Sequence, residues 1–169
     1  MSPGSDLPPG ASATPRAPIE IRPLAATDID AVLALAATLP EAPHWSREHY
    51  SQSVFSTAPL RRIALAAYHT RSREVVGFAI ASLIPPEAEL ETVAVAGPWQ
   101  RQGIAAHLLA ALVHELKVAE VSEVRLEVRV SNQPAIDFYQ SQNFKQIGVR
   151  DRYYADPEED ALIMSLLLS

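Results

Sequence analysis

The chain has 169 residues, of which 48% are hydrophobic, and a formal net charge of −6. A chain of this length and composition fits one globular domain with a sizeable core. The acidic balance, without a polybasic patch, argues against a nucleic-acid-binding protein and permits a basic partner. The lack of cysteine excludes disulfides, thiolate metal sites, iron–sulfur clusters and a cysteine acyl-enzyme.

The sequence contains no apolar run long enough to span a membrane, and its N-terminus lacks the basic-then-apolar order of a secretory signal. We therefore expect a cytoplasmic protein without a membrane partner. Residues 1–18 hold five of the fourteen prolines and little that would anchor a core. They predict a disordered, Pro-rich tail, which leaves residues 19–169 as the folded domain.

The first half of this domain predicts two helices and four strands. One helix starts at Thr27 and is closed by Pro40, and a second has Ser46 as its N-cap, with Trp45 placed to pack on Tyr50. Polar residues between two β-like runs indicate a hairpin, and a third antiparallel strand follows it. The predicted strands are Ile19–Pro23, Arg62–Tyr68, Val75–Ile84 and Glu87–Ala96.

The second half predicts two helices and three strands. The helices run from Ile104 to about Ala119 and from the N-cap Asn132 to about Ser141. The strands are Val124–Val130, Phe144–Val149 and Ala161–Leu168, the last two flanking a long loop, Arg150–Asp160. The whole order predicts an α/β fold with a mixed sheet of about seven strands and four helices, with parallel pairing where a helix intervenes.

The junction between the strand ending near Ala96 and the helix starting at Ile104 predicts an anion site. A strand that turns sharply into a helix leaves the first-turn N–H groups without intrahelical partners. Gly103 has no side chain and Ala105 a small one, so a phosphate ester can approach the backbone, and Arg101 adds positive charge. Nucleotide-binding fingerprints are missing, so we expect a phosphorylated ligand other than ATP or NAD. Taken alone, Gly103 is equally explained as a small residue in a helix turn.

Five motifs surround and follow this junction. They are Thr92–Val95 before Gln100–Ala105, Leu126–Asn132, Ala135–Tyr139, Arg152–Tyr154 and Glu159–Met164. Together they resemble the GNAT superfamily of N-acetyltransferases, most closely the bacterial ribosomal-protein-alanine N-acetyltransferases. The resemblance implies a GNAT acyl-CoA N-acyltransferase fold and transfer of the acetyl group of acetyl-CoA to the N-terminal amine of a protein, with a ribosomal protein as the expected acceptor. The five histidines make no case for a metal site, so we expect no metal.

The resemblance also implies roles for single residues. Glu127 would be the general base and Tyr139 the general acid. The expected cofactor-binding residues are Val93, Ala94 and Val95 along the pantetheine arm, Arg101, Gln102, Gly103, Ile104, Ala105 and Ala106 around the pyrophosphate, and Asn132 at the thiol end. The residues expected on the peptide side are Glu91, Tyr153 and Tyr154.

Elementary chemistry supports the two catalytic roles. A terminal α-amine has a pKa of about 8, so much of it is protonated near neutral pH and must lose a proton before it attacks a thioester. Glu127 lies on the polar face of a predicted strand and can take that proton. A phenol such as Tyr139 can return a proton to the departing thiolate.

Structural explanations compete with each role. Glu127 between two arginines can be a cross-strand ion-pair former, Asn132 an ordinary N-cap, Tyr139 a core aromatic, and the Tyr153-Tyr154 pair hairpin filling. Glu91, expected to face the same way as Val93 and Val95, is the rival base. The acceptor is also open: a small-molecule amine or a lysine side chain would use the same chemistry, and a non-catalytic acyl-CoA-binding module would use only the fold.

Overall fold

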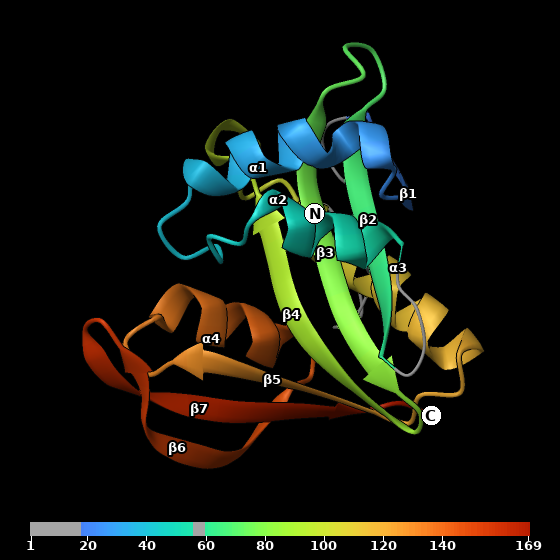
Figure 1. Cartoon of the computed structure of the whole chain (residues 1–169). Helices are drawn as coiled ribbons and strands as arrows, with labels where there is room; N and C mark the ends of the chain where they lie inside the picture. Colours follow the sequence, from blue (N-terminus) through green and yellow to red (C-terminus); the bar gives the residue numbers. More distant parts are fainter. Residues whose placement is uncertain (1–17, 56–59) are drawn as a thin grey trace, which may run out of the picture.

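The computed structural model describes residues 18–55 and 60–169. Its centre is one seven-stranded sheet with the order β1-β2-β3-β4-β5-β7-β6 (Figure 1). The strands are β1 (Ile19–Pro23), β2 (Arg61–His69), β3 (Val75–Ile84), β4 (Glu87–Val95), β5 (Glu123–Arg129), β6 (Lys145–Ala155) and β7 (Glu158–Leu167). The helices are α1 (Ile29–Ala37), α2 (Arg47–Val54), α3 (Ile104–Val118) and α4 (Gln133–Ser141), with 3-10 turns η1 (Ala26–Asp28) and η2 (Gly97–Trp99). The predicted α/β architecture is confirmed.

Local side-chain chemistry explains where several helices begin and end. The Ser46 hydroxyl accepts a hydrogen bond from the His49 amide at 3.2 Å, and the Asn132 side chain accepts one from the Ala135 amide at 3.2 Å. Both are predicted N-caps that satisfy first-turn N–H groups. Asn143, after α4, has φ 70°, the left-handed conformation that ends many helices and that asparagine tolerates.

The helices cover β1–β4 more completely than they cover β5–β7. In Figure 1, α1 and α2 lie in front of β2 and β3, and α3 lies behind the sheet. The front cluster includes the fully buried side chains of Val32, Tyr50 and Phe78, and the back cluster includes those of Leu108 and Leu112. In Figure 1, α1 and α2 do not extend over β5–β7, and α4 lies next to β5.

Gly77 lets three elements approach one another at the end of β4. A Cβ on Gly77 would lie 2.8 Å from the Ala94 carbonyl oxygen and 3.2 Å from a Leu108 methyl group. Any larger residue would therefore move the β4 backbone or the α3 packing. The position of the last residues of β4 depends on this glycine.

The strands β4 and β5 form the one parallel pair among the described strands, and they pair only at their start. Glu87, Ala88 and Glu89 oppose Glu123, Val124 and Arg125, and beyond them the two strands diverge (Figure 1). β4 also carries a bulge, because Thr92 opposes Ile80 and Leu90 opposes Ala81, leaving Glu91 as the extra residue. The bulge and the divergence open the sheet at its centre.

The prediction of a long loop over Arg150–Asp160 is wrong. This segment continues β6 and starts β7 as a hairpin, with Tyr154 opposite Glu159 and Ala155 opposite Glu158. Most of its side chains are exposed, so the alternation of apolar and polar residues that marks a half-buried strand is missing there. The predicted tail lies outside the described residues except for Pro18, whose carbonyl accepts a hydrogen bond from the Thr70 amide at 2.9 Å.

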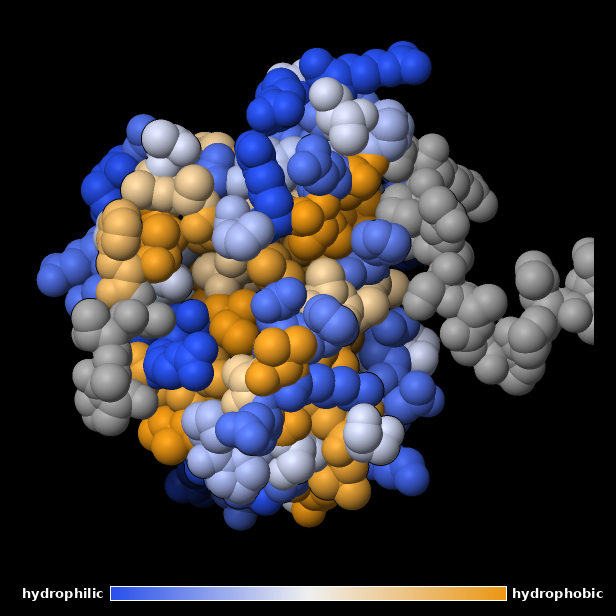
Figure 2. All heavy atoms as spheres, turned by 90° about the vertical axis from the view of Figure 1, so that its right-hand side faces the viewer, coloured by the Kyte–Doolittle hydropathy of each residue, from blue (hydrophilic) through white to orange (hydrophobic). Residues whose placement is uncertain are grey.

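The side of the molecule that carries β1, β2 and α3 mixes hydrophobic and hydrophilic groups (Figure 2). A cavity of about 340 Å³ between β1, β2, α2 and α3 is lined by Ile21, Leu24, Val54 and Ile63, among others, and it contains none of the predicted site residues. Within the described residues, no helix is long and apolar enough to cross a membrane.

Candidate active site

A cavity of about 350 Å³ lies where β4 and β5 diverge. It is lined by both candidate bases, by the candidate acid and by the last residues of β4, which the sequence separates by up to 48 positions. The predicted residues that line it are Glu91, Val93, Ala94, Val95, Glu127, Asn132, Tyr139 and Tyr154. The fold therefore brings most of the predicted site into one cavity.

A second cavity, of about 300 Å³, surrounds the turn between β4 and α3. Its lining includes five of the predicted pyrophosphate residues, namely Arg101, Gly103, Ile104, Ala105 and Ala106. Val95 and Gln100 line both cavities, so the turn and the β4–β5 opening adjoin. The sixth predicted residue, Gln102, is not part of this lining; its side-chain amide donates to the Pro98 carbonyl at 3.3 Å.

Backbone conformation adds a reason for glycine in this turn. Gly103 has φ 85° and is the residue from which α3 starts, and Arg101 has φ 59°. The sequence suggested Gly103 for its small size, whereas the left-handed conformation also disfavours every residue with a side chain. The first-turn amides of α3 lack intrahelical partners and can bind an anion.

Glu127 is both an ion-pair former and a cavity-lining carboxylate. Its side chain is 17% exposed and its Oε1 lies 3.1 Å from Nη1 of Arg150 on β6. The neighbouring arginines of its own strand have other partners: Arg125 pairs with Glu123 at 2.9 Å and Arg129 with Glu159 at 3.3 Å. A hydrogen bond to Glu127 and partial burial raise the pKa of Tyr153 to about 12, so this phenol stays protonated.

The rival carboxylate, Glu91, is held by Arg62 of β2. The guanidinium donates from Nε at 2.9 Å and from Nη2 at 3.3 Å to the two carboxylate oxygens, and both side chains are at least 85% buried. The expectation that Glu91 faces the same way as Val93 is wrong, because Val93 packs against the α3 side of the sheet. The bulge turns Glu91 toward Arg62, where its charge is neutralised.

Tyr139 on α4 also lines the cavity. Its ring packs edge-on against Phe144, with 5.6 Å between the centroids. Burial raises the pKa of Tyr139 to about 12. The hydroxyl is therefore fully protonated at neutral pH and is available as a proton donor.

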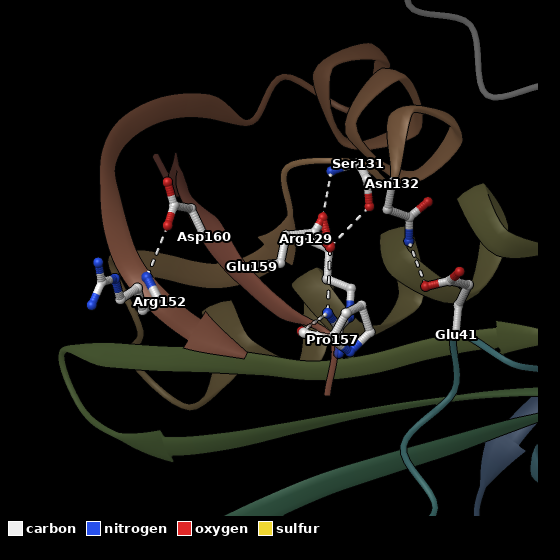
Figure 3. Close-up of polar contacts among 8 residues, drawn as sticks. All are labelled: Glu41, Arg129, Ser131, Asn132, Arg152, Pro157, Glu159 and Asp160. Carbon is white, nitrogen blue, oxygen red and sulfur yellow. Dashed lines mark hydrogen bonds and ion pairs between the residues drawn. The ribbon is translucent and has the colours of Figure 1, made fainter. Parts of the chain in front are cut away.

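Asn132 is at once a helix N-cap and a residue of the cavity wall. It caps α4 and also lines the cavity, and its Nδ2 donates to Oε2 of Glu41 at 3.4 Å. Glu41 comes from the segment between α1 and α2, so this contact joins the two halves of the domain across the cavity mouth (Figure 3). Nothing in the sequence pattern around Glu41 pointed to this role.

A polar cluster ties the β6–β7 hairpin to the start of α4 (Figure 3). Glu159 accepts hydrogen bonds from the Ser131 amide at 3.1 Å and the Ser131 hydroxyl at 2.9 Å, and it pairs with Arg129. These contacts with Ser131 and Arg129 lower the pKa of Glu159. The Arg129 guanidinium also lies over the ring of Tyr154, 4.2 Å from its centroid. Sequence reasoning missed this cluster because it expected Glu159 in a loop.

Within the described residues, no group of three or more histidine or acidic side chains is arranged to hold a metal ion. The donors that the site offers are backbone amides, carboxylates and phenols. Such groups suit the binding of an acyl donor and the movement of protons.

Comparison with known proteins agrees with this geometry. The model of the Acetyltransferase (GNAT) family matches residues 29–144. A curated relative, the [ribosomal protein bS18]-alanine N-acetyltransferase of Escherichia coli K12, is 40% identical over 102 residues, which are 59% of this chain and 69% of the relative. An N-alpha-acetyltransferase of Saccharolobus solfataricus is 45% identical over 75 residues, 44% of each chain.

Solved structures extend the likeness to nearly the whole chain. The crystal structure of the Escherichia coli ribosomal-protein-S18-alanine N-acetyltransferase matches with a TM-score of 0.74 and 33% identity, over 89% of this chain and 94% of that one. Arabidopsis thaliana NAA60 in complex with acetyl-CoA shares the fold, with a TM-score of 0.79 at 18% identity over 89% and 98% of the two chains. The chain belongs to the GNAT family of acetyltransferases, enzymes that take their acetyl group from acetyl-CoA.

Proposed function

We propose that this enzyme acetylates the N-terminal α-amine of a protein, with the alanine terminus of a ribosomal protein as its acceptor. The acceptor is suggested by the Escherichia coli relative, which is named for that substrate. The observation that carries the chemistry is that Glu127, Tyr139 and the diverging edge of β4 line one cavity. This arrangement suits direct attack by the amine within a ternary complex.

Acetyl-CoA supplies the activated acetyl group, and two features of this chain suit its binding. The backbone of Val93, Ala94 and Val95 lies along the edge of β4 from which β5 has diverged, so its polar groups can pair with the amides of an extended pantetheine arm. The turn from Arg101 to Ala106 offers the unpaired amides of the α3 N-terminus to the pyrophosphate. Asn132, which lines the same cavity as Glu127 and Tyr139, is assigned to the thiol end of the cofactor.

Glu127 is the base in this proposal. The incoming amine carries an extra proton near neutral pH, because its pKa is about 8, and a carboxylate can remove that proton directly or through water. Glu91 lines the same cavity but is engaged at both oxygens by Arg62. Glu127 accepts a hydrogen bond from Tyr153 and pairs through one oxygen with Arg150, whose side chain is 56% exposed, so solvent weakens this ion pair.

Tyr139 is the acid. Its phenol keeps its proton because burial raises the pKa to about 12, and it can pass that proton to the sulfur of the departing coenzyme. Tyr153, Tyr154 and Glu91 are assigned to the peptide side, where Tyr154 is held under Arg129. The ring of Tyr153 lies edge-on to that of Tyr154, with 5.0 Å between the centroids.

Replacing Glu127 tests the central role. Glu127→Gln should lower kcat about 10²- to 10⁴-fold at neutral pH, the range typical of a lost proton transfer, while the affinity for acetyl-CoA measured by calorimetry changes little. Glu91→Gln is the matched control and should retain most of kcat. A collapse of kcat in Glu91→Gln with an active Glu127→Gln would reverse the assignment of the base.

The acceptor is tested with a panel of peptides that differ in their first residue. Mass spectrometry after incubation with acetyl-CoA should detect acetylation of the α-amine, fastest with alanine at the first position. Acetylation confined to internal lysines or to small amines would replace the proposed acceptor and leave the chemistry intact. Binding of acetyl-CoA with no transfer to any amine would instead indicate a non-catalytic module.

A further inference from the structure

A groove of about 450 Å³ continues from the catalytic cavity. Glu127 lines both spaces, so the groove begins where the proposed base meets the amine. Its lining also includes Ile84 of β3 and Glu89 of β4. Of the residues that line the groove, Glu127 alone has a role in the proposed mechanism.

The charged side chains of the groove form ion pairs, with Glu89 as the exception among the described residues. Arg125 pairs with Glu123 at 2.9 Å and Glu87 at 3.9 Å, and Arg150 pairs with Glu127 at 3.1 Å. Among the ion pairs of residues 18–55 and 60–169, none includes Glu89. Partial burial and the negative charges of Glu127 and Glu91 raise the pKa of Glu89, and the Arg150 guanidinium opposes this shift without reversing it.

The walls beside Glu89 are hydrophobic. Ile84 is 61% exposed, Leu60 is 37% exposed, and Ile163 completes this part of the lining. Exposed apolar side chains that line a groove with a carboxylate outside any ion pair suit a ligand group with an aliphatic stem and a cationic end. Lysine and arginine side chains have this form, because their methylene groups pack on apolar surface while the charged end reaches a polar partner.

The spacing fits a residue close to the acetylated terminus. Glu89 lies opposite Arg125 on β5, and Glu127 is two residues further along that strand, a distance of about 6–7 Å. Successive Cα atoms of a peptide are about 3.8 Å apart. A residue that follows the acetylated one can therefore place its side chain in the groove while the amine remains at Glu127.

We propose that this groove binds the lysine or arginine side chain of the residue directly after the acetylated one, with Glu89 as its ion-pair partner. The inference rests on the proposed acetylation of protein N-termini and adds a preference for a basic second residue. Glu89 acts as a specificity-determining residue and takes no part in proton transfer.

Two peptides that differ only at the second position, Ala-Lys and Ala-Met followed by the same residues, test the assignment with the full-length enzyme. The wild type should acetylate the lysine peptide with a kcat/KM about fivefold higher, the effect of an ion pair near the upper end of the exposed range. Glu89→Gln should lose this preference through KM and keep its rate on the methionine peptide. Glu87→Gln, which lines the same groove but already pairs with Arg125, is the matched control and should keep the preference.

A charge-reversal experiment sharpens the result. Glu89→Lys should prefer an Ala-Glu peptide to the Ala-Lys peptide. Equal kcat/KM of the wild type on Ala-Lys and Ala-Met would overturn the groove assignment alone, and so would a Glu89→Gln variant that keeps the full preference. If the wild type acetylates no peptide terminus at all, both the groove assignment and the proposed function are wrong.

Discussion

The strands β3 and β6, which lie on the two sides of the β4–β5 opening, differ in how much of their length is buried. β3 is buried along nearly its whole length, between α1 and α2 on one face and α3 on the other. β6, at the far edge of the same sheet, is exposed at nine of its eleven positions. Yet the two strands are of similar length and lie in one continuous hydrogen-bonded sheet.

We infer from this difference that the buried half of the sheet mainly determines stability and the exposed half mainly determines specificity. The buried half supplies hydrophobic burial, the dominant favourable term in folding, and sets the position of β4. The exposed half carries Arg150, Tyr153 and Glu159, which contact Glu127 and Ser131 by polar interactions. We therefore expect substitutions in β3 to act on folding and substitutions in β5–β7 to act on substrate.

The largest expected effect comes from truncating one large apolar side chain in each half. Phe78→Ala on β3 should lower the free energy of unfolding by about 3–5 kcal/mol, because a fully buried aromatic leaves a cavity. Ile147→Ala on β6, at a side chain that is 54% exposed, should change it by less than about 0.5 kcal/mol. Urea denaturation measures both, and equal losses would remove the distinction between the halves.

A smaller effect is expected at the turn that joins the buried half to the proposed pyrophosphate site. Gly103→Ala should cost about 1–2 kcal/mol of stability, because φ is 85° at this position, and should raise KM for acetyl-CoA. Gly97→Ala in the same turn is the control, since a Cβ there meets no atom within 4 Å. Thermal melts measure the change in stability, and steady-state kinetics measure the KM for acetyl-CoA. An unchanged KM in Gly103→Ala would place the pyrophosphate elsewhere.

The smallest effect is a pH dependence in the exposed half. The pKa of Glu159 is lowered by Ser131 and Arg129, so its ionised form stabilises the fold above the ordinary glutamate pKa of about 4.3, and this contribution is lost as the pH falls through the lowered value. The melting temperature of Glu159→Gln should therefore lie below that of the wild type at pH 6 and approach it in acid. Glu158→Gln, at an ion pair whose side chains are more than 60% exposed, should show little difference at either pH.

The positions of several candidate residues were predictable because their signals are local, whereas their roles were inferred from the resemblance to the GNAT superfamily. Gly103 marks a turn, Asn132 a helix cap, and Glu127 the polar face of a strand, and each can be recognised within a few residues. Glu41 and Arg62 were missed, because each matters only through a partner 91 or 29 positions away. Glu89 was missed for a related reason: its environment depends on Ile84, Ile163 and Leu60, which lie on separate elements.

The sequence by itself determined the order of the elements and their caps, since hydrophobic periodicity and capping act over one or two helical turns, and its motifs indicated the class of chemistry through their resemblance to a known family. Only the tertiary structure decided which carboxylate is held at both oxygens by a buried arginine and which stands beside Tyr153. The bulge at Glu91 exists because β4 pairs with β3 out of simple register, and the cavity exists because β5 leaves β4 after three residues. Both are properties of strand pairing between distant segments, where the free energy depends on partners that no local pattern specifies.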